Sequence, residues 1–211
     1  MKIVRCWFYR LFRCYFDKTI GYFHFIFNPE MIKILFDDDK NINLKISGNE
    51  ISLGCTTQNI NSLKFIVNYQ LINESLYLNF DPLFDDLEQY NKYLFKILIN
   101  GGFKMIVVCN NSLDNNILFD WIINHIETST DLTKMVANIV LHCSGFSNLS
   151  LSEKAKSMRT TENFNCYEFA NIYNPEMNYY IFFEKKDDLL NSVKIVKMWG
   201  DNMEYIKNKK D

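Results

Sequence analysis

The sequence is short of the features that several classes of protein require. Its 211 residues include only three prolines and seven glycines, and no glycine-rich turn follows a predicted strand. A P-loop or a dinucleotide-binding turn is therefore not expected. No uncharged apolar run reaches the length of a membrane-spanning helix. Positive charge is not in excess, because the formal net charge is −2, so no nucleic-acid partner is predicted.

Metal-binding spacings are missing as well. The chain has six cysteines and three histidines but no CxxC or HxxxH pair, and the acidic runs at 37–39 and 85–86 lack the alternating spacing of a calcium loop. Charges between residues 2 and 13 interrupt any signal-peptide core. We therefore predict no catalytic site, no metal and no cofactor, and reduced thiols in a cytoplasmic or nuclear protein.

What is present is apolar and regularly patterned. Hydrophobic residues make up 48% of the chain and aromatic residues 16%, which is typical of one folded domain. FKMIVVC (103–109) and MVANIVLHC (135–143) are continuous apolar runs, which predict strands buried on both faces. Helical periodicity over 28–39, 58–70, 85–99 and 115–127 alternates with these strands and with others expected at 19–27, 40–46 and 75–80.

This alternation predicts an α/β fold with a mainly parallel sheet. The strand-to-strand spacing of about 30 residues is also compatible with a curved, leucine-rich-repeat-like array. Strands predicted at 166–173, 178–185 and 192–199 leave no room for helices between them, so we expect an antiparallel meander that caps the sheet. The expected division is a helix over 1–18, a repeat-like domain over 19–160, a meander over 161–200 and a flexible tail over 201–211.

The tetrapeptide Asn-Pro-Glu-Met occurs twice, at 28–31 and 174–177, and contains two of the three prolines. The residues after the first copy have helical character, so Asn28 is predicted to cap a helix that begins at Pro29. The residues after the second copy suit a strand, so Asn174 and Pro175 are predicted to form a turn. We interpret the two copies as separate local signals, one that begins a helix and one that forms a turn, and not as a duplicated unit.

The N-terminal segment 4–16, VRCWFYRLFRCYF, is predicted to form one helix. Phe8, Phe12 and Phe16 recur every four residues and are flanked by Trp7 and Leu11, and this broad aromatic face favours packing against the core. The alternative is a basic amphipathic helix that makes the protein membrane-peripheral, since Arg10 and Arg13 gather on the opposite side.

A second alternative is a cysteine-dependent enzyme that uses a cleft at the ends of the strands. His142 and Cys143 end one predicted buried strand and Cys109 ends another, and ligands bind at strand ends in open α/β sheets. Cys143 is the candidate nucleophile and His125 the candidate base, but no third orienting group is identified.

Several longer segments resemble a known family. These are FIFNPEMIKILFDDDK, LFKILINGG, WIINHIETSTDLTKMVANIVL, NLSLSEKA and FANIYNPEMNYYIFF. Together they are similar to the C-terminal region of the expanded F-box-type proteins of plant-parasitic root-knot nematodes, over roughly residues 20–199. The resemblance implies a modular adaptor, in which an F-box binds Skp1 of a cullin-type ubiquitin ligase and a downstream domain recruits the target protein.

The F-box itself is not recognised in this sequence. That module usually begins with a Leu-Pro pair, which is absent, and the helix predicted at 4–16 is too short to form it. The sequence therefore predicts a non-enzymatic protein-interaction domain with an unidentified target, and a link to Skp1 and cullin only if an F-box lies upstream.

Overall fold

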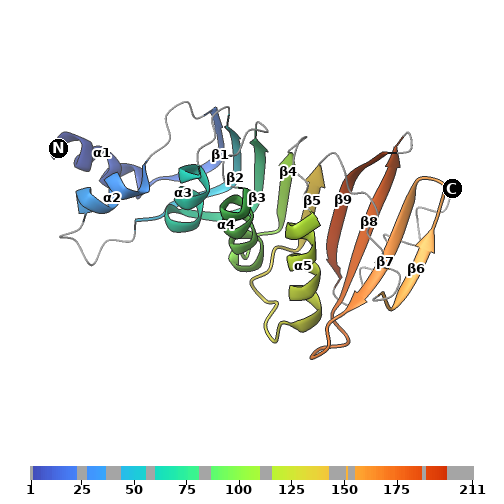
Figure 1. Ribbon diagram of the computed structural model, residues 1–211. Helices are drawn as coiled ribbons and strands as arrows, with labels where there is room; N and C mark the ends of the chain where they lie inside the picture. Colours follow the sequence, from blue (N-terminus) through green and yellow to red (C-terminus); the bar gives the residue numbers. More distant parts are fainter. Residues whose placement is uncertain are drawn as a thin grey trace.

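The computed structural model describes residues 2–22, 28–36, 44–55, 60–80, 87–109, 116–142, 151, 155–186 and 189–198. These residues form five helices and one nine-stranded sheet (Figure 1). In chain order the elements are α1 (Lys2–Leu11), β1 (Tyr15–Tyr22), α2 (Pro29–Phe36), β2 (Ile46–Cys55), α3 (Asn61–Tyr69), β3 (Gln70–Phe80), α4 (Leu87–Asn100), β4 (Met105–Cys109), α5 (Asn116–Thr128), β5 (Asn138–His142), β6 (Ser157–Thr160), β7 (Phe164–Ala170), β8 (Asn178–Lys186) and β9 (Leu189–Met198).

The sheet has a parallel half and an antiparallel half. Strands β1 to β5 are parallel neighbours in chain order, and each successive pair is connected through one helix. Beyond β5 the order is β9, β8, β7 and β6, and all four pairs are antiparallel. The predicted α/β class and the C-terminal meander are confirmed. The antiparallel half is as large as the parallel half, so the sheet as a whole is mixed.

The meander joins the sheet in reverse order. The last strand, β9, returns to pair with β5, and this leaves β6 as the outermost strand. All four side chains of β6 are exposed, which explains why no apolar pattern predicted this strand.

The main core lies between the sheet and the helices α3, α4 and α5, which cover one face (Figure 1). Alternate strand residues point into it, and burial in β4 and β5 alternates between full and partial. The prediction that β4 and β5 are buried on both faces was therefore wrong. Only the side chains on the face towards the helices are fully buried, and those on the other face are half-buried. The strand residues of this core include Leu76, Leu78, Ile106, Val108, Ile139, Leu141, Ile181, Phe183, Val193 and Ile195.

A smaller core joins α1 and α2 to the rest of the molecule. Phe8 and Phe12 of α1 pack with residues of α2 and with Ile46 and Phe65, which belong to β2 and α3. The ring centroids of Phe8 and Phe12 are 5.9 Å apart, and Phe12 meets the Phe36 ring edge-on at the same distance. The prediction that the aromatic face of the first helix packs inward is confirmed for these two residues.

The first helix ends earlier than predicted, at Leu11. Tyr15 and Phe16 belong to β1, where they pair with Ser47 and Gly48 of β2. The aromatic period of four continues through this segment, but pairing with a distant strand decides its conformation. The strand expected at 40–46 is also misplaced, because β2 begins at Ile46 and residues 44–45 are not in a strand. Residues 23–27, 40–43 and the predicted tail lie outside the described residues.

Both copies of Asn-Pro-Glu-Met have the predicted conformations. The Oδ1 atom of Asn28 accepts a hydrogen bond from the backbone N–H of Glu30 at 2.9 Å, and α2 begins at Pro29. In the second copy, the N–H of Met177 donates to the carbonyl of Asn174 at 3.0 Å, which closes a turn before β8.

A buried asparagine holds the second copy against α5. The side-chain amide of Asn171 donates to the carbonyls of Ile126 and Ser129 at 2.7 and 2.9 Å. Its Oδ1 accepts from the backbone N–H groups of Tyr173 and Asn174 at 2.9 and 2.8 Å. This side chain, only 2% exposed, thus holds the loop between β7 and β8 against the end of α5, together with the backbone hydrogen bond from the N–H of Ile172 to the carbonyl of Glu127 at 2.9 Å.

Candidate functional site

The carboxyl ends of β4 and β5 bring two candidate residues together. Cys109 and His142 are direct partners in the strand register, so the prediction that these strand ends are neighbours is confirmed. They alternate with the core residues Val108 and Leu141, and therefore point to the face of the sheet away from α3, α4 and α5. Cys143 lies outside the described residues.

The chemistry of this pair does not match an activated nucleophile. Burial raises the pKa of the Cys109 thiol, whereas a reactive cysteine needs a lowered pKa because the thiolate is the attacking species. The candidate base, His125, lies on α5 on the opposite side of the sheet, where its ring centroid is 5.8 Å from that of Phe95. Burial lowers the pKa of His125 and favours the neutral ring. Among the described residues, no three of the types His, Cys, Asp and Glu gather where they could hold a metal ion.

The side of the sheet away from α3, α4 and α5 is the larger candidate surface, and we call it the open face. One row of side chains crosses it through eight strands in continuous register. The members of this central row, from β2 to β6, are Ser52, Tyr77, Val107, Val140, Lys194, Phe182, Cys166 and Arg159.

The open face has an apolar and aromatic middle. Tyr77, Val107, Val140 and Phe182 are half-buried, so each keeps part of its surface in contact with solvent. The ring of Phe182 meets that of Phe164, also on this face, in an edge-on contact with centroids 5.8 Å apart. Aromatic side chains that are neither buried nor isolated are common in the centres of protein interfaces.

Charged and polar groups border this middle. Lys194 stands in the central row between Val140 and Phe182. Near the carboxyl ends of the parallel strands, the Ser192 hydroxyl of β9 donates to a Glu184 oxygen of β8 at 2.8 Å. On β7, Glu168 accepts from the Ser157 hydroxyl and pairs with an exposed lysine. The open face therefore carries one apolar group on β3, β4 and β5 and another on β7 and β8, with Lys194 between them and further polar groups near the edges, a mixture that is compatible with a protein-binding surface.

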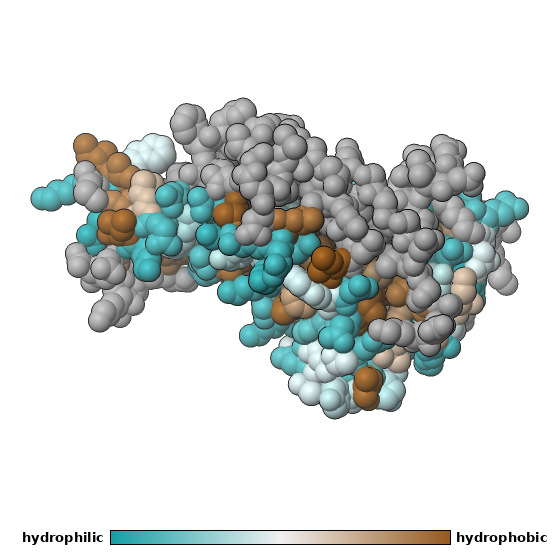
Figure 2. All heavy atoms as spheres, viewed as in Figure 1, coloured by the Kyte–Doolittle hydropathy of each residue, from teal (hydrophilic) through white to brown (hydrophobic). Residues whose placement is uncertain are grey.

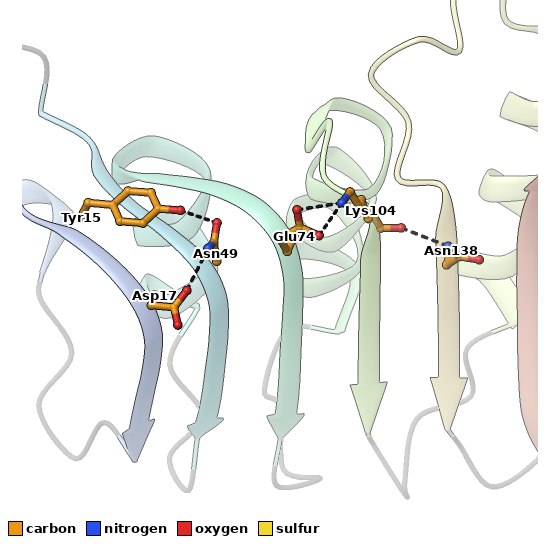
Figure 3. A network of polar contacts seen from close by, with 6 residues as sticks. All are labelled: Tyr15, Asp17, Asn49, Glu74, Lys104 and Asn138. Carbon is orange, nitrogen blue, oxygen red and sulfur yellow. Dashed lines mark hydrogen bonds and ion pairs between the residues drawn. The ribbon is translucent and has the colours of Figure 1, made fainter.

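A polar network links the amino ends of the parallel strands (Figure 3). Asn49 accepts from the Tyr15 hydroxyl and donates to Asp17 at 2.9 Å. Further along, the Lys104 ammonium binds both oxygens of Glu74 at 2.8 and 2.7 Å. These side chains are exposed and the ion pair is in water, so the network fixes strand register and is worth little energy.

The Lys104 carbonyl continues the network to the next strand. It accepts from the backbone N–H of Asn138 at 2.9 Å, and the Asn138 side-chain amide is 3.4 Å from the same oxygen. These two contacts extend the pairing of β4 and β5 by one residue beyond the strands themselves, which is a structural role.

One pocket of about 250 Å³ lies where α3 and α4 end. Lys45 and Lys96 line it together with Gln70. The Lys45 ammonium is 3.4 Å from the carbonyl of Val67, and burial lowers the pKa of this lysine. Because helix C-termini are negative, Lys45 is explained as a counter-charge to the end of α3. The pocket needs no ligand to account for its residues.

Comparison with known proteins gives one family match. Residues 1–81 match a family described as a domain of unknown function (DUF8381). The matched region contains α1 to β3, the first three parallel strands with their helices. No curated protein and no solved structure matches the chain. Of the helices described by the structure, none has the length and apolar character to span a membrane.

Proposed function

We propose that the chain is a non-enzymatic domain that binds a target protein on its open face. The observation that carries this proposal is the central row, which presents half-exposed apolar side chains on three adjacent strands, β3 to β5, and a fourth on β8, beyond Lys194 of β9. Among the described residues, α3, α4 and α5 pack on the other face, and these four side chains keep part of their surface accessible to a partner. The raised pKa of Cys109 supports binding over thiol chemistry.

The arrangement of the parallel half supports the same use. Parallel strands that follow one another in chain order, with their helices on one side, are the arrangement of αβ repeat proteins, whose sheet face binds partners. We propose that the sheet is curved in the manner of leucine-rich repeats and that Tyr77, Val107 and Val140 lie at the centre of the contact.

The proposed adaptor role adds a second step to target binding. If the natural chain carries an F-box before this domain, Skp1 and a cullin would associate with it and the bound target would be ubiquitinated, in the cytoplasm or the nucleus. A longer chain that includes any upstream reading frame, purified from cells, should then recover Skp1. Recovery of the target without Skp1 would reject the ligase role and leave the binding role intact.

The binding role is tested by a charge reversal in the central row. Lys194→Glu places a negative charge between Val140 and Phe182 without removing a core side chain, since Lys194 is half-exposed. Lys96→Glu is the matched control, because Lys96 is exposed on α4, on the covered side of the sheet. A photo-reactive amino acid introduced at Val140 identifies the partner by covalent capture.

We expect one protein to be captured from position 140, and its yield to fall at least about tenfold in Lys194→Glu, as for the loss of a central contact. Lys96→Glu should leave the capture unchanged. Equal capture by both variants, or capture only from positions on α4, would overturn the assignment of the open face. Selective labelling of Cys143 by a thiol-reactive activity probe would instead favour the enzyme.

A further inference from the structure

The first helix carries an apolar surface that the fold does not use. Phe8 and Phe12 point into the smaller core, but Ile3 is 80% exposed and Trp7 is 74% exposed. Val4 is also exposed. Ile3 and Trp7 are four residues apart and so form one ridge along α1, beside the stripe that is buried. Figure 2 shows hydrophobic residues at the surface of the N-terminal end of the molecule, where α1 lies in Figure 1.

Basic residues lie beside this ridge. Lys2, Arg10 and Arg13 are exposed, and residues 1–16 contain no acidic residue. The Arg13 guanidinium lies 4.1 Å above the Tyr9 ring, which holds this charge close to the helix. Around the helix, the order is a buried aromatic stripe, an exposed apolar ridge and a basic side.

We propose that the ridge of Ile3, Val4 and Trp7 binds the surface of an anionic lipid membrane. The ridge runs along the helix axis, so α1 would lie flat in the interface with these side chains at the boundary between headgroups and acyl chains. Tryptophan prefers this depth because its ring is apolar and its N–H is polar. The exposed cations beside it complement negatively charged headgroups.

Attachment of α1 to the smaller core makes the geometry specific. Its inner stripe is held by α2, β2 and α3, so the helix cannot turn its aromatic face towards lipid without leaving that core. Only the outer ridge would enter the interface, and the sheet would stay in water. Membrane binding would therefore be shallow, reversible and dependent on negative charge.

The test measures co-sedimentation of the full chain with two kinds of vesicle. One is phosphatidylcholine alone, and the other contains equal parts of phosphatidylcholine and phosphatidylserine. We expect binding to the second kind only, weakened by salt because surface charges are screened. The fluorescence of Trp7 should shift to shorter wavelength on binding, and the Trp7→Phe variant identifies the part of the signal that comes from this residue.

Variants separate the ridge from the charges. Trp7→Ser should lower the partition coefficient by about tenfold, the loss expected for one large apolar side chain, and Arg10→Gln by about fivefold. Both residues are exposed, so the fold should be unchanged by circular dichroism. Ile172→Ser is the matched control, because Ile172 is an apolar residue 67% exposed in the loop between β7 and β8. Its partition should equal that of the wild type.

Three results would overturn the proposal. The first is binding to neither vesicle. The second is equal binding to both vesicles or binding that Trp7→Ser leaves intact. The third is a dimer in analytical ultracentrifugation that is lost in Trp7→Ser while vesicles are not bound, because the ridge would then be covered by a second copy of the chain.

Discussion

Among the loop residues that the structure describes, the buried Asn171 should be highly sensitive to substitution. Four hydrogen bonds, all between 2.7 and 2.9 Å, converge on its side chain from the end of α5 and from its own loop. Substitution by alanine removes all four and leaves the buried carbonyl of Ile126 without this donor. At about 1 kcal/mol for each bond, with some of the exposed groups regaining water, we expect a loss of about 3 kcal/mol in the free energy of unfolding.

The assay is equilibrium unfolding in urea, supported by thermal melting. In a chain of this size, a loss of about 3 kcal/mol lowers Tm by roughly 10 °C. Asn174→Ala is the matched control, since Asn174 is the same residue type three positions later but is exposed. It should change stability by less than about 0.5 kcal/mol. If Asn171→Ala is as mild as Asn174→Ala, the loop is held by something other than this side chain.

Three further predictions concern backbone and charge. Gly101→Ala should destabilise more than Gly102→Ala, because a Cβ at residue 101 would lie 2.4 Å from the Phe103 ring, whereas residue 102 has only the strain of φ +66°; chemical denaturation measures both. Asn28→Ala should cost about 1 kcal/mol in the same assay by removing the cap of α2. Burial lowers the pKa of Lys197 below 10.5, so the stability of the wild type relative to Lys197→Met should increase as pH rises towards 10.5; a difference independent of pH would contradict this.

The sign for Lys197 follows from where the proton is held. Lys197 is only 7% exposed, and its ammonium donates a hydrogen bond to the carbonyl of Leu132 at 2.7 Å. Between its lowered pKa and 10.5 the unfolded chain keeps the proton that the folded chain has released. Stability therefore rises with pH in that window, and the methionine variant lacks this dependence.

Local signals in the sequence were sufficient for the central elements. The apolar runs around 105–109 and 138–142 correctly predict strands, because a short apolar run between two helical segments is typical of a strand. The glycines after residue 100 correctly end α4, with Gly102 at φ +66°. The two Asn-Pro-Glu-Met copies were interpreted correctly from the residues that follow them.

Elements that depend on distant partners were not predictable in the same way. The segment ISGNEISLGC, which forms β2, contains two glycines and little apolar alternation, so it resembles a loop. Its conformation comes from β1 on one side and β3 on the other. The return of β9 to β5 has no local signal either, because the sequence determines that a strand forms and not which neighbour it takes.

The candidate surfaces illustrate the same distinction. The adjacency of Cys109 and His142 could be predicted, since parallel neighbouring strands end at one edge. The central row could not, because Tyr77 and Phe182 are separated by more than a hundred residues and become part of one surface only through β4, β5 and β9.

Trp7 shows that an apolar helix face can be buried in one part and exposed in another. The sequence places Trp7 beside Phe8 and Phe12 on one broad apolar face of the helix, and predicts that the whole face is buried. The smaller core is too narrow for that: between residues 2 and 13 only Phe8 and Phe12 are buried in it, and Tyr9 and Leu11 pack against it in part, whereas Trp7 is 74% exposed. A helix on the side of a sheet can bury a stripe, whereas a wider apolar face leaves a remainder in water. In α1 that remainder is bordered by arginine and lysine, and this combination is what makes the ridge a candidate for lipid and not only an unfilled part of the core.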